Sequence, residues 1–237
     1  MFTGVLLCAL LVPGTIGILL IPPENLGEDV LQALYIPSAS WRPSPNGVCS
    51  DLQFNACQAN FDQAMNISTA LKWKDSQMLN MLIRLRLMIP DFKNFLAVCK
   101  ARQGFYSCLG SSFSTCVDLF SLLRRPGASF ANVVPYVELW KHLDFICNAG
   151  FEVFYANRDC NYRVEAKFAD DLEKCKTTFT DGIEKNPTAY CSLATQMTAC
   201  YQKIFRSECG SEMGWFACED ARIGFAQNCQ NLRCYVA

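Results

Sequence analysis

The stretch that decides the fold, residues 186–234, reads NPTAYCSLATQMTACYQKIFRSECGSEMGWFACEDARIGFAQNCQNLRC. Asn186 and Pro187 predict the start of a helix, because Asn is a good N-cap and Pro suits the first helical position. Gly210 predicts the end of that helix, and Ser211 is expected to cap the next one. Four cysteines in this stretch recur every nine residues, at Cys191, Cys200, Cys209 and Cys218. The stretch therefore predicts consecutive helices that carry several cysteines.

Cysteines with this spacing cannot bond to one another along a continuous helix. Nine residues advance an α-helix by about 13.5 Å, whereas a disulfide needs Cα atoms within about 7 Å of each other. Two triplets have a spacing of eight or nine residues: Cys99, Cys108 and Cys116, and Cys191, Cys200 and Cys209. We therefore expect each member to bond to another element of the fold. Gly104 and Gly110 predict helix breaks near the first triplet, and the spacing rule applies only where the helix is continuous.

The N-terminus resembles a secretory signal peptide. Residues 1–17 contain a short apolar run from Val5 to Val12, followed by the small residues Thr15 and Gly17 that suit cleavage. A membrane anchor is the alternative, although a Pro-Gly pair interrupts the apolar run. We expect the signal peptide to be removed and the rest of the chain to be secreted into the extracellular space.

Cysteine usage agrees with secretion. Removal of Cys8 with the signal peptide leaves 14 of the 15 cysteines, and an even number in a secreted chain predicts up to seven disulfides. The cysteines expected to form them are Cys49, Cys57, Cys99, Cys108, Cys116, Cys147, Cys160, Cys175, Cys191, Cys200, Cys209, Cys218, Cys229 and Cys234. Zinc is the rival interpretation, but structural zinc sites use closely paired cysteines and the sequence has no C-x2-C. We therefore expect no metal and no cofactor.

Composition narrows the classes of partner. Apolar residues make up 51% and charged residues 18%, which is typical of a globular chain. The net charge of −1 gives no reason to expect a nucleic acid or an anionic membrane surface as partner. The best candidate for a later transmembrane segment, Met78 to Ile89, contains Arg84 and Arg86, so no such segment is expected.

The chain divides into three parts: the signal peptide at 1–17, a Pro-rich N-terminal segment at 18–48 and one cysteine-rich helical domain at 49–237. We expect the Pro-rich segment to be extended or loosely packed on the surface, with two or three helical turns at most, from Leu26 to Tyr35. A propeptide or a docking arm is the alternative. Apolar residues at helical spacing predict that the domain is all-α, a disulfide-stapled bundle of roughly seven to nine short helices.

Two further stretches are predicted to be helical, and the first of them has an apolar face with two possible roles. Met78, Met81 and Met88 could line an adaptable ligand groove, although plain core is the favoured interpretation. The charged run at 163–176 has apolar residues every four positions, which predicts one amphipathic helix with a solvated face.

Asn66 is the expected site of glycosylation. Asn66-Ile67-Ser68 is the only N-glycosylation acceptor in the sequence. Because it lies at a predicted break between two helices, we expect Asn66 to be exposed and modified.

A catalytic centre cannot be assembled from the sequence. His142 is the only histidine, and hydrolytic triads need a positioned base. We expect His142 to be half-exposed on a helix and to have no catalytic role. The sequence has no P-loop, dinucleotide-binding, nucleophile-elbow or EF-hand pattern. No enzymatic activity is therefore expected, and a secreted hydrolase is a remote alternative.

A family resemblance adds to these observations. The run from Tyr136 to Cys160, which contains LDFICNAG and NRDC, resembles a secreted cysteine-rich domain of unknown function that is known from nematodes and abundant in molluscs. The later cysteines and the motif GWFAC at 214–218 are similar to the same family. The likeness covers roughly Cys49 to Cys234 and rests on cysteine spacing and a few aromatic residues. It implies a secreted helical domain and transfers no activity and no catalytic residue.

The sequence therefore favours a secreted disulfide-rich protein that binds an extracellular protein or matrix component. An extracellular carrier of a small apolar ligand is the second interpretation, because stapled helices can enclose cavities. A large closed apolar cavity would favour the carrier, and a flat exposed aromatic patch would favour the protein partner. A cleft that gathers His142 with carboxylates would favour an enzyme.

Overall fold

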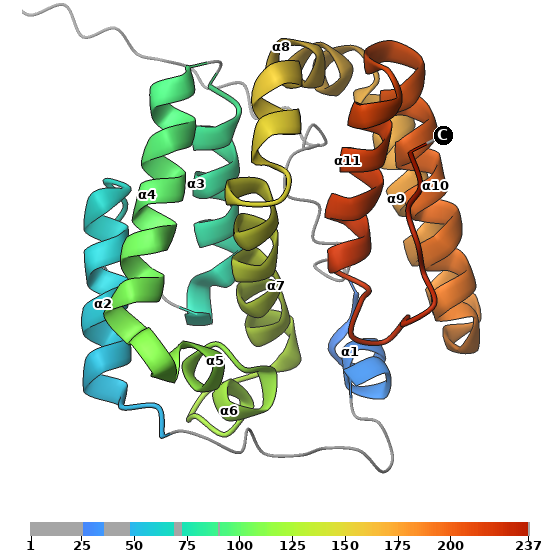
Figure 1. Cartoon of the computed structure of the whole chain (residues 1–237). Coiled ribbons are helices and arrows are strands. Elements are labelled where there is room, and N and C mark those ends of the chain that lie inside the picture. Colours follow the sequence, from blue (N-terminus) through green and yellow to red (C-terminus); the bar gives the residue numbers. More distant parts are fainter. Residues whose placement is uncertain (1–25, 36–47, 69–72, 90, 237) are drawn as a thin grey trace, which may run out of the picture.

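The structure is a computed structural model that describes residues 26–35, 48–68, 73–89 and 91–236; the expected signal peptide lies outside these ranges. Helices make up nearly all of the regular structure in the described residues, and no strand occurs among them. They pack side by side around α7 (Phe130–Cys147), which separates the first half of the chain from the second (Figure 1). The prediction of an all-α, disulfide-stapled bundle is confirmed.

The first half is built around α4 (Phe92–Leu109), which packs against α7 and two other long helices. Asp91 caps α4, since its carboxylate accepts a hydrogen bond of 2.9 Å from the backbone N–H of Lys93. Gly110 ends the helix in the left-handed region, with φ at 54°. The other elements of this half are α2 (Asp51–Ala64), η2 (Trp73–Asp75), α3 (Ser76–Leu87), η3 (Gly110–Ser112), α5 (Phe113–Cys116) and α6 (Leu119–Leu123).

The second half is built around α10 (Tyr190–Cys209), the longest helix of the described chain. Asn186 caps a 3₁₀ turn that leads into α10, and Gly210 ends α10 with φ at 91°, as the sequence predicts. The other elements are α8 (Phe151–Lys167), α9 (Ala169–Lys185), η4 (Pro187–Ala189) and α11 (Ser211–Ile223). α9 and α11 both pack along α10, so the second half is a three-helix layer with α8 across its end (Figure 1).

Disulfides staple each half separately. Within the described residues the pairs are Cys49–Cys116, Cys57–Cys108 and Cys99–Cys147 in the first half, and Cys160–Cys209, Cys175–Cys200, Cys191–Cys229 and Cys218–Cys234 in the second. None of these seven bonds joins two members of the same triplet, as helix geometry requires. Each triplet instead ties its helix to neighbouring elements. None of the seven crosses from one half to the other, so non-covalent packing must hold the halves together.

A cluster of aromatic rings lies where the two halves meet. Phe95 on α4 lies 4.8 Å from Phe154 on α8, measured between ring centroids. Phe216 on α11 lies 5.2 Å from Phe145 on α7 and 5.7 Å from Phe154. Rings at these separations add roughly 0.5–1.5 kcal/mol per pair beyond the area that they bury. The aromatic cluster therefore contributes to the non-covalent packing that holds the two halves together.

The N-terminal helix α1 (Glu28–Tyr35) belongs to the core, and the expectation of a loosely packed segment is wrong for these residues. Leu31 and Tyr35 are fully buried where α1 lies against α7 (Figure 1). The carboxylate of Glu28 accepts hydrogen bonds of 2.8 and 2.7 Å from the backbone N–H groups of Phe130 and Ala131. Glu28 thus caps the first turn of α7, where a negative charge is favourable.

Three local predictions are wrong. Gly104 does not break α4, because the helix runs through it to Leu109. Ser211 is the first residue of α11 and makes no side-chain cap, since Gly210 occupies the cap position. The charged run at 163–176 is not one helix, because the backbone turns at Phe168 between α8 and α9.

Candidate functional site: a groove between α9 and α10

Helices α9 and α10 run antiparallel and lie close together. The Cys175–Cys200 disulfide joins them with a Cα–Cα distance of 5.9 Å. Gly182 gives the closest approach, because a Cβ at this position would lie 2.8 Å from Leu193. The hydroxyl of Tyr201 donates a hydrogen bond of 3.2 Å to the backbone oxygen of Leu172. A covalent bond, a small residue and a buried hydrogen bond thus fix the two helices in one register.

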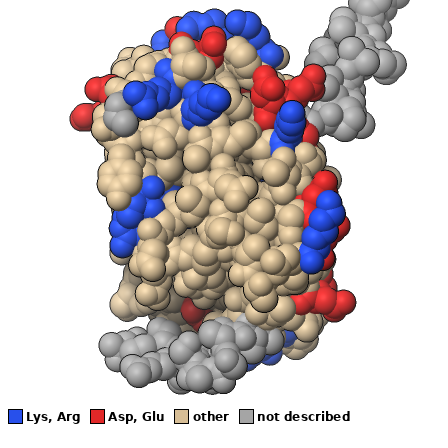
Figure 2. Space-filling model, turned by 90° about the vertical axis from the view of Figure 1, so that its right-hand side faces the viewer, with Lys and Arg blue, Asp and Glu red and all other residues tan. Residues whose placement is uncertain are grey.

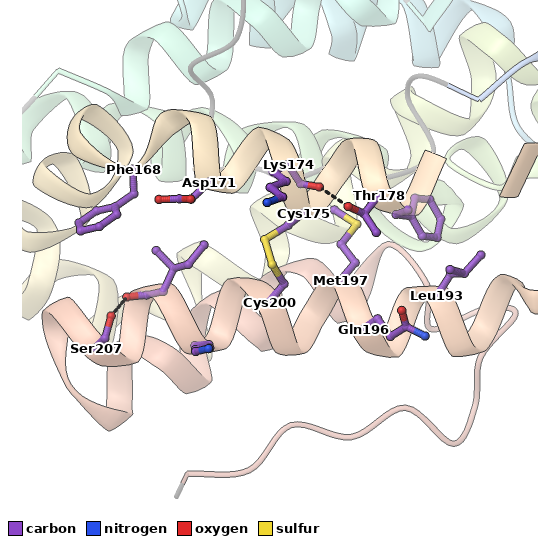
Figure 3. Close-up of a pocket in the computed structure, with 13 residues that line it drawn as sticks. Phe168, Asp171, Lys174, Cys175, Thr178, Leu193, Gln196, Met197, Cys200 and Ser207 are labelled. Carbon is purple, nitrogen blue, oxygen red and sulfur yellow. Dashed lines mark hydrogen bonds between the residues drawn. A yellow bond between two sulfur atoms is a disulfide. The ribbon is translucent and has the colours of Figure 1, made fainter. Parts of the chain in front are cut away.

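A groove of about 410 Å³ follows the line between these helices. Its floor is apolar and consists of the Cys175–Cys200 disulfide with the buried side chains of Phe179 and Met197. The remaining lining residues are half-buried Phe168, Leu193 and Ile204, and exposed Asp171, Lys174, Thr178, Gln196, Lys203 and Ser207. Figure 3 shows that α9 and α10 supply opposite sides of the groove, with the disulfide bridging them. The volume and the apolar lining are typical of small-molecule sites.

Hydroxyl groups along the groove are already hydrogen-bonded to the backbone. Thr178 donates a hydrogen bond of 2.7 Å to the carbonyl of Lys174, and Ser207 donates one of 2.9 Å to the carbonyl of Ile204 (Figure 3). Because their donors are used within each helix, these side chains add little polarity to the groove. Its lining is therefore more apolar than the residue types alone suggest.

The charged side chains of the groove have no partner within the described part of the chain. This holds for Asp171, Lys174 and Lys203, none of which forms an ion pair there. All three are exposed, and the cations outnumber the carboxylate. The groove thus combines an apolar floor with cationic groups that are free to bind a ligand.

The surface over α10 beside the groove carries little charge. The sequence has no charged residue between Lys185 and Lys203, and α10 exposes Ser192, Thr195 and Gln196 instead. Figure 2 shows this side of the molecule, where acidic and basic residues lie along the edges and the middle is uncharged. A partner can therefore approach α10 without displacing an ion pair.

His142 is buried, and the expectation that it is half-exposed is wrong. Its side chain has 0% exposure on α7, and its Nδ1 lies 2.8 Å from Oδ1 of Asp220 on α11, which is also buried. The contact joins the two halves of the molecule. A His–Asp pair can serve as a catalytic base and its orienting group. Both side chains are buried in this structure, and their contact links α7 to α11.

The methionine-rich face of α3 points outward, which contradicts its interpretation as plain core. Met78 and Met81 have exposures of 47% and 37%, and Leu85 and Ile89 continue the same apolar stripe. Met78 and Met81 line a hollow of about 620 Å³, whose other lining residues are mostly polar and come from η2, α3 and the start of α7. Nothing in the structure indicates what covers the stripe.

A third hollow, between α4, α5 and α7, contains an ion pair. Arg102 bonds to Asp144 and lies over the ring of Tyr106, 5.2 Å from its centroid. Because Arg102 pairs with Asp144, and Lys141 pairs with Glu138, the charged groups of this hollow are already engaged, so it offers a ligand less than the α9–α10 groove does.

Asn66 is exposed, as expected, and directly follows the C-terminus of α2 with φ at 51°. Asn is one of the few residues other than Gly that adopts this conformation readily. Glycosylation of Asn66 stays a prediction; loss of the attached mass in Asn66→Gln is its test.

Two kinds of feature are absent from the described residues. Among the described residues, no group of three or more His, Cys, Asp or Glu side chains could hold a metal ion. Within the same ranges, none of the helices is both long enough and apolar enough to cross a bilayer. Comparisons with protein-family models, with curated proteins and with solved structures found no match for this chain.

One feature of the sequence indicates the α10 side of the groove. The absence of charge between Lys185 and Lys203 marks α10 as unusual for an exposed helix. The side of the groove that α9 supplies is not evident from the sequence, because the pattern at 163–176 predicts a single helix with a solvated face. Phe168 lines the groove only because the chain turns there.

Proposed function

We propose that this chain is a secreted, disulfide-rich protein that acts by binding rather than by catalysis, and that the α9–α10 groove is its binding site. The observation that carries the proposal is the apolar groove lined with two lysines that lack a partner in the described chain. Seven disulfides support an oxidising compartment, because such bonds persist outside the cytosol. The burial of His142 with Asp220 supports a role without catalysis.

Rigidity supports the same proposal. A disulfide crosses the groove, and α10 is tied at three positions along its length, through Cys191, Cys200 and Cys209. A site that is already ordered before binding loses less conformational entropy when it is occupied. The arrangement therefore suits recognition by a preformed surface.

A variant that fills the groove tests the proposal. Thr178 lines the groove, whereas its neighbour Thr177 is equally exposed and does not. The secreted protein and its Thr178→Trp and Thr177→Trp variants would be immobilised and exposed to extracellular fluid from the source. We expect the unmodified protein and Thr177→Trp to retain the same molecule, and Thr178→Trp to lose it. Equal retention by all three proteins would place the binding site elsewhere.

A protein partner that packs on the uncharged face of α10 is the second candidate function. The observation that favours it is the row of exposed uncharged side chains on the face of α10 beside the groove, including Ser192, Thr195 and Ala199, none of which lines the groove. Thr195→Arg would place a charge on this face without entering the groove. If this candidate is right, Thr195→Arg should abolish retention of the partner, and Thr178→Trp should leave it unchanged.

A further inference from the structure

The dimensions of the groove limit what can occupy it. Its lining extends from Phe168 to Phe179 on α9 and from Leu193 to Ser207 on α10. At about 1.5 Å per residue this is roughly 17–21 Å, so a volume of about 410 Å³ gives a mean cross-section of roughly 20–25 Å². An α-helix with side chains is about 10–12 Å wide, or roughly 80–110 Å² in cross-section. The groove is therefore too narrow to enclose a helix, and it suits a single extended chain of atoms.

Charge divides the groove along its length. Because the helices are antiparallel and joined at Cys175–Cys200, Phe179 and Thr178 lie opposite Gln196 and Met197 on one side of the disulfide. Leu193, packed against Gly182, closes that end. This half of the lining contains no charged residue. It is the part of the groove that suits a hydrocarbon chain.

The other half contains the three charged side chains of the lining. Lys174 lies beside the disulfide (Figure 3), and Lys203 is the next charged residue along α10. Asp171 lies on the opposite helix from Lys203, one turn before Lys174. Two cations and one carboxylate leave one net positive charge. This half therefore complements a negatively charged group.

We propose that the groove binds one anionic amphiphile with a single unbranched chain, such as a long-chain carboxylate. The inference rests on the proposed function and names the ligand class of the same site. The hydrocarbon chain lies over Phe179 and Met197 in the uncharged half. The acidic head group lies near Lys174 and Lys203, where charge-assisted hydrogen bonds are available. The ligand is then oriented by charge and held by apolar contact.

Titration calorimetry with three probes tests the ligand class, below the concentrations at which they form micelles. Dodecanoate has the required chain and charge, dodecyltrimethylammonium has the same chain with the opposite charge, and octanoate has the same charge with a shorter chain. We expect one dodecanoate per protein, with an affinity at least tenfold higher than that of either other probe. Equal affinity for the two dodecyl probes would overturn the role of the lysines, and equal affinity for the two carboxylates would overturn that of the chain.

Matched variants test the location. The double variant Lys174→Gln and Lys203→Gln should weaken dodecanoate binding about tenfold and should not weaken binding of the cationic probe. Lys100→Gln, at an exposed position of α4 outside the groove, should change the affinity for neither probe. Thr178→Trp should weaken dodecanoate at least tenfold, and Thr177→Trp should not. Gln196→Trp with Thr195→Trp as its control repeats the test on α10, in case Thr178→Trp does not fold. Unchanged dodecanoate affinity in every folded groove variant would overturn the inference.

Failure of this inference is distinguishable from failure of the proposed function. If no probe binds but the groove-filling variant still loses the molecule retained from extracellular fluid, the ligand class is wrong and the groove remains the binding site. An acidic peptide as the retained molecule would give that outcome. If the groove-filling variant retains the molecule and no probe binds, both are wrong.

Discussion

The close packing of α10 against α11 predicts opposite effects for the same substitution at two glycines. Gly214 on α11 faces the backbone of α10, where an added Cβ would lie 2.7 Å from Cβ of Arg206 and 3.0 Å from the carbonyl oxygen of Gln202. Gly104 lies in the middle of α4 and is exposed, and an added Cβ there would meet nothing within 4 Å. Both glycines are inside helices, so replacement by Ala removes the same conformational penalty at each.

The surroundings of the two glycines determine how much each substitution changes the free energy of unfolding. Gly104→Ala should stabilise the protein by about 0.5–1 kcal/mol, which is the usual gain for Ala over Gly in a helix. Gly214→Ala has the same gain but forces the helices apart, because ordinary contact begins at about 3.4 Å. Overpacking costs typically about 1–3 kcal/mol. The Cys160–Cys209 and Cys218–Cys234 disulfides restrain both helices, so the cost should fall at the upper end, for a net loss of about 1–2 kcal/mol.

Urea unfolding of both variants with their disulfides intact measures these effects. The midpoint should rise for Gly104→Ala and fall for Gly214→Ala, with an unchanged dependence of the free energy of unfolding on urea concentration. The two variants should differ by about 2–3 kcal/mol. If Gly214→Ala stabilises the protein as much as Gly104→Ala does, the close approach of α10 and α11 does not exist and the packing of the second half is misassigned.

Three further predictions follow from buried polar groups. Glu28→Gln should lower the melting temperature by roughly 2–4 °C because it weakens the cap on α7 by about 1 kcal/mol, whereas Asp29→Asn in the same turn of α1 should not. His142→Ala should lower the free energy of unfolding by about 3–5 kcal/mol, because it leaves the buried carboxyl of Asp220 without its hydrogen-bond partner, yet binding by the folded protein should stay within a few-fold. Burial raises the pKa of five tyrosines, that of Tyr162 to about 12 and the rest further: Tyr35, Tyr136, Tyr162, Tyr190 and Tyr201. A tyrosine in the unfolded chain has a pKa of about 10, so the stability gained from burying the neutral rings is complete below pH 10. Above pH 10 the free energy of unfolding falls by about 1.4 kcal/mol per pH unit for each fully buried ring. Phenolate absorbance and the helical circular dichroism signal should therefore change together at alkaline pH, and complete ionisation of the tyrosines in an intact fold would contradict their burial.

The parts of the fold that depend on local chemistry could be predicted from the sequence. The cap at Asn186 and the stop at Gly210 rest on side chains and backbone angles within a few residues. The rule that neighbouring cysteines of a triplet do not bond rests only on the rise of an α-helix. Neither these helix ends nor the cysteine rule depends on which helices are neighbours in the fold.

Predictions failed where distant segments decide the outcome. Glu28 and Phe130 are far apart in the sequence, so the docking of α1 leaves no local pattern. His142 is predicted to be half-exposed on its helix, but α7 is covered on several sides and buries this side chain against α11. The groove needs the register of α9 against α10, which the pairing of Cys175 with Cys200 determines and which spacing alone does not reveal.

The central claim is that the α9–α10 groove is the binding site, and the methyl resonance of Met197 tests it most directly. Met197 lies in the floor of the groove, Met213 lies in the core against α10, and Met78 and Met81 lie on the exposed stripe of α3. Nuclear magnetic resonance of the full chain with isotope-labelled methionine methyl groups would be recorded during titration with dodecanoate. We expect the Met197 resonance to shift and saturate at one equivalent while those of Met78 and Met81 stay in place. A shift of Met78 or Met81 with an unchanged Met197 would contradict the claim.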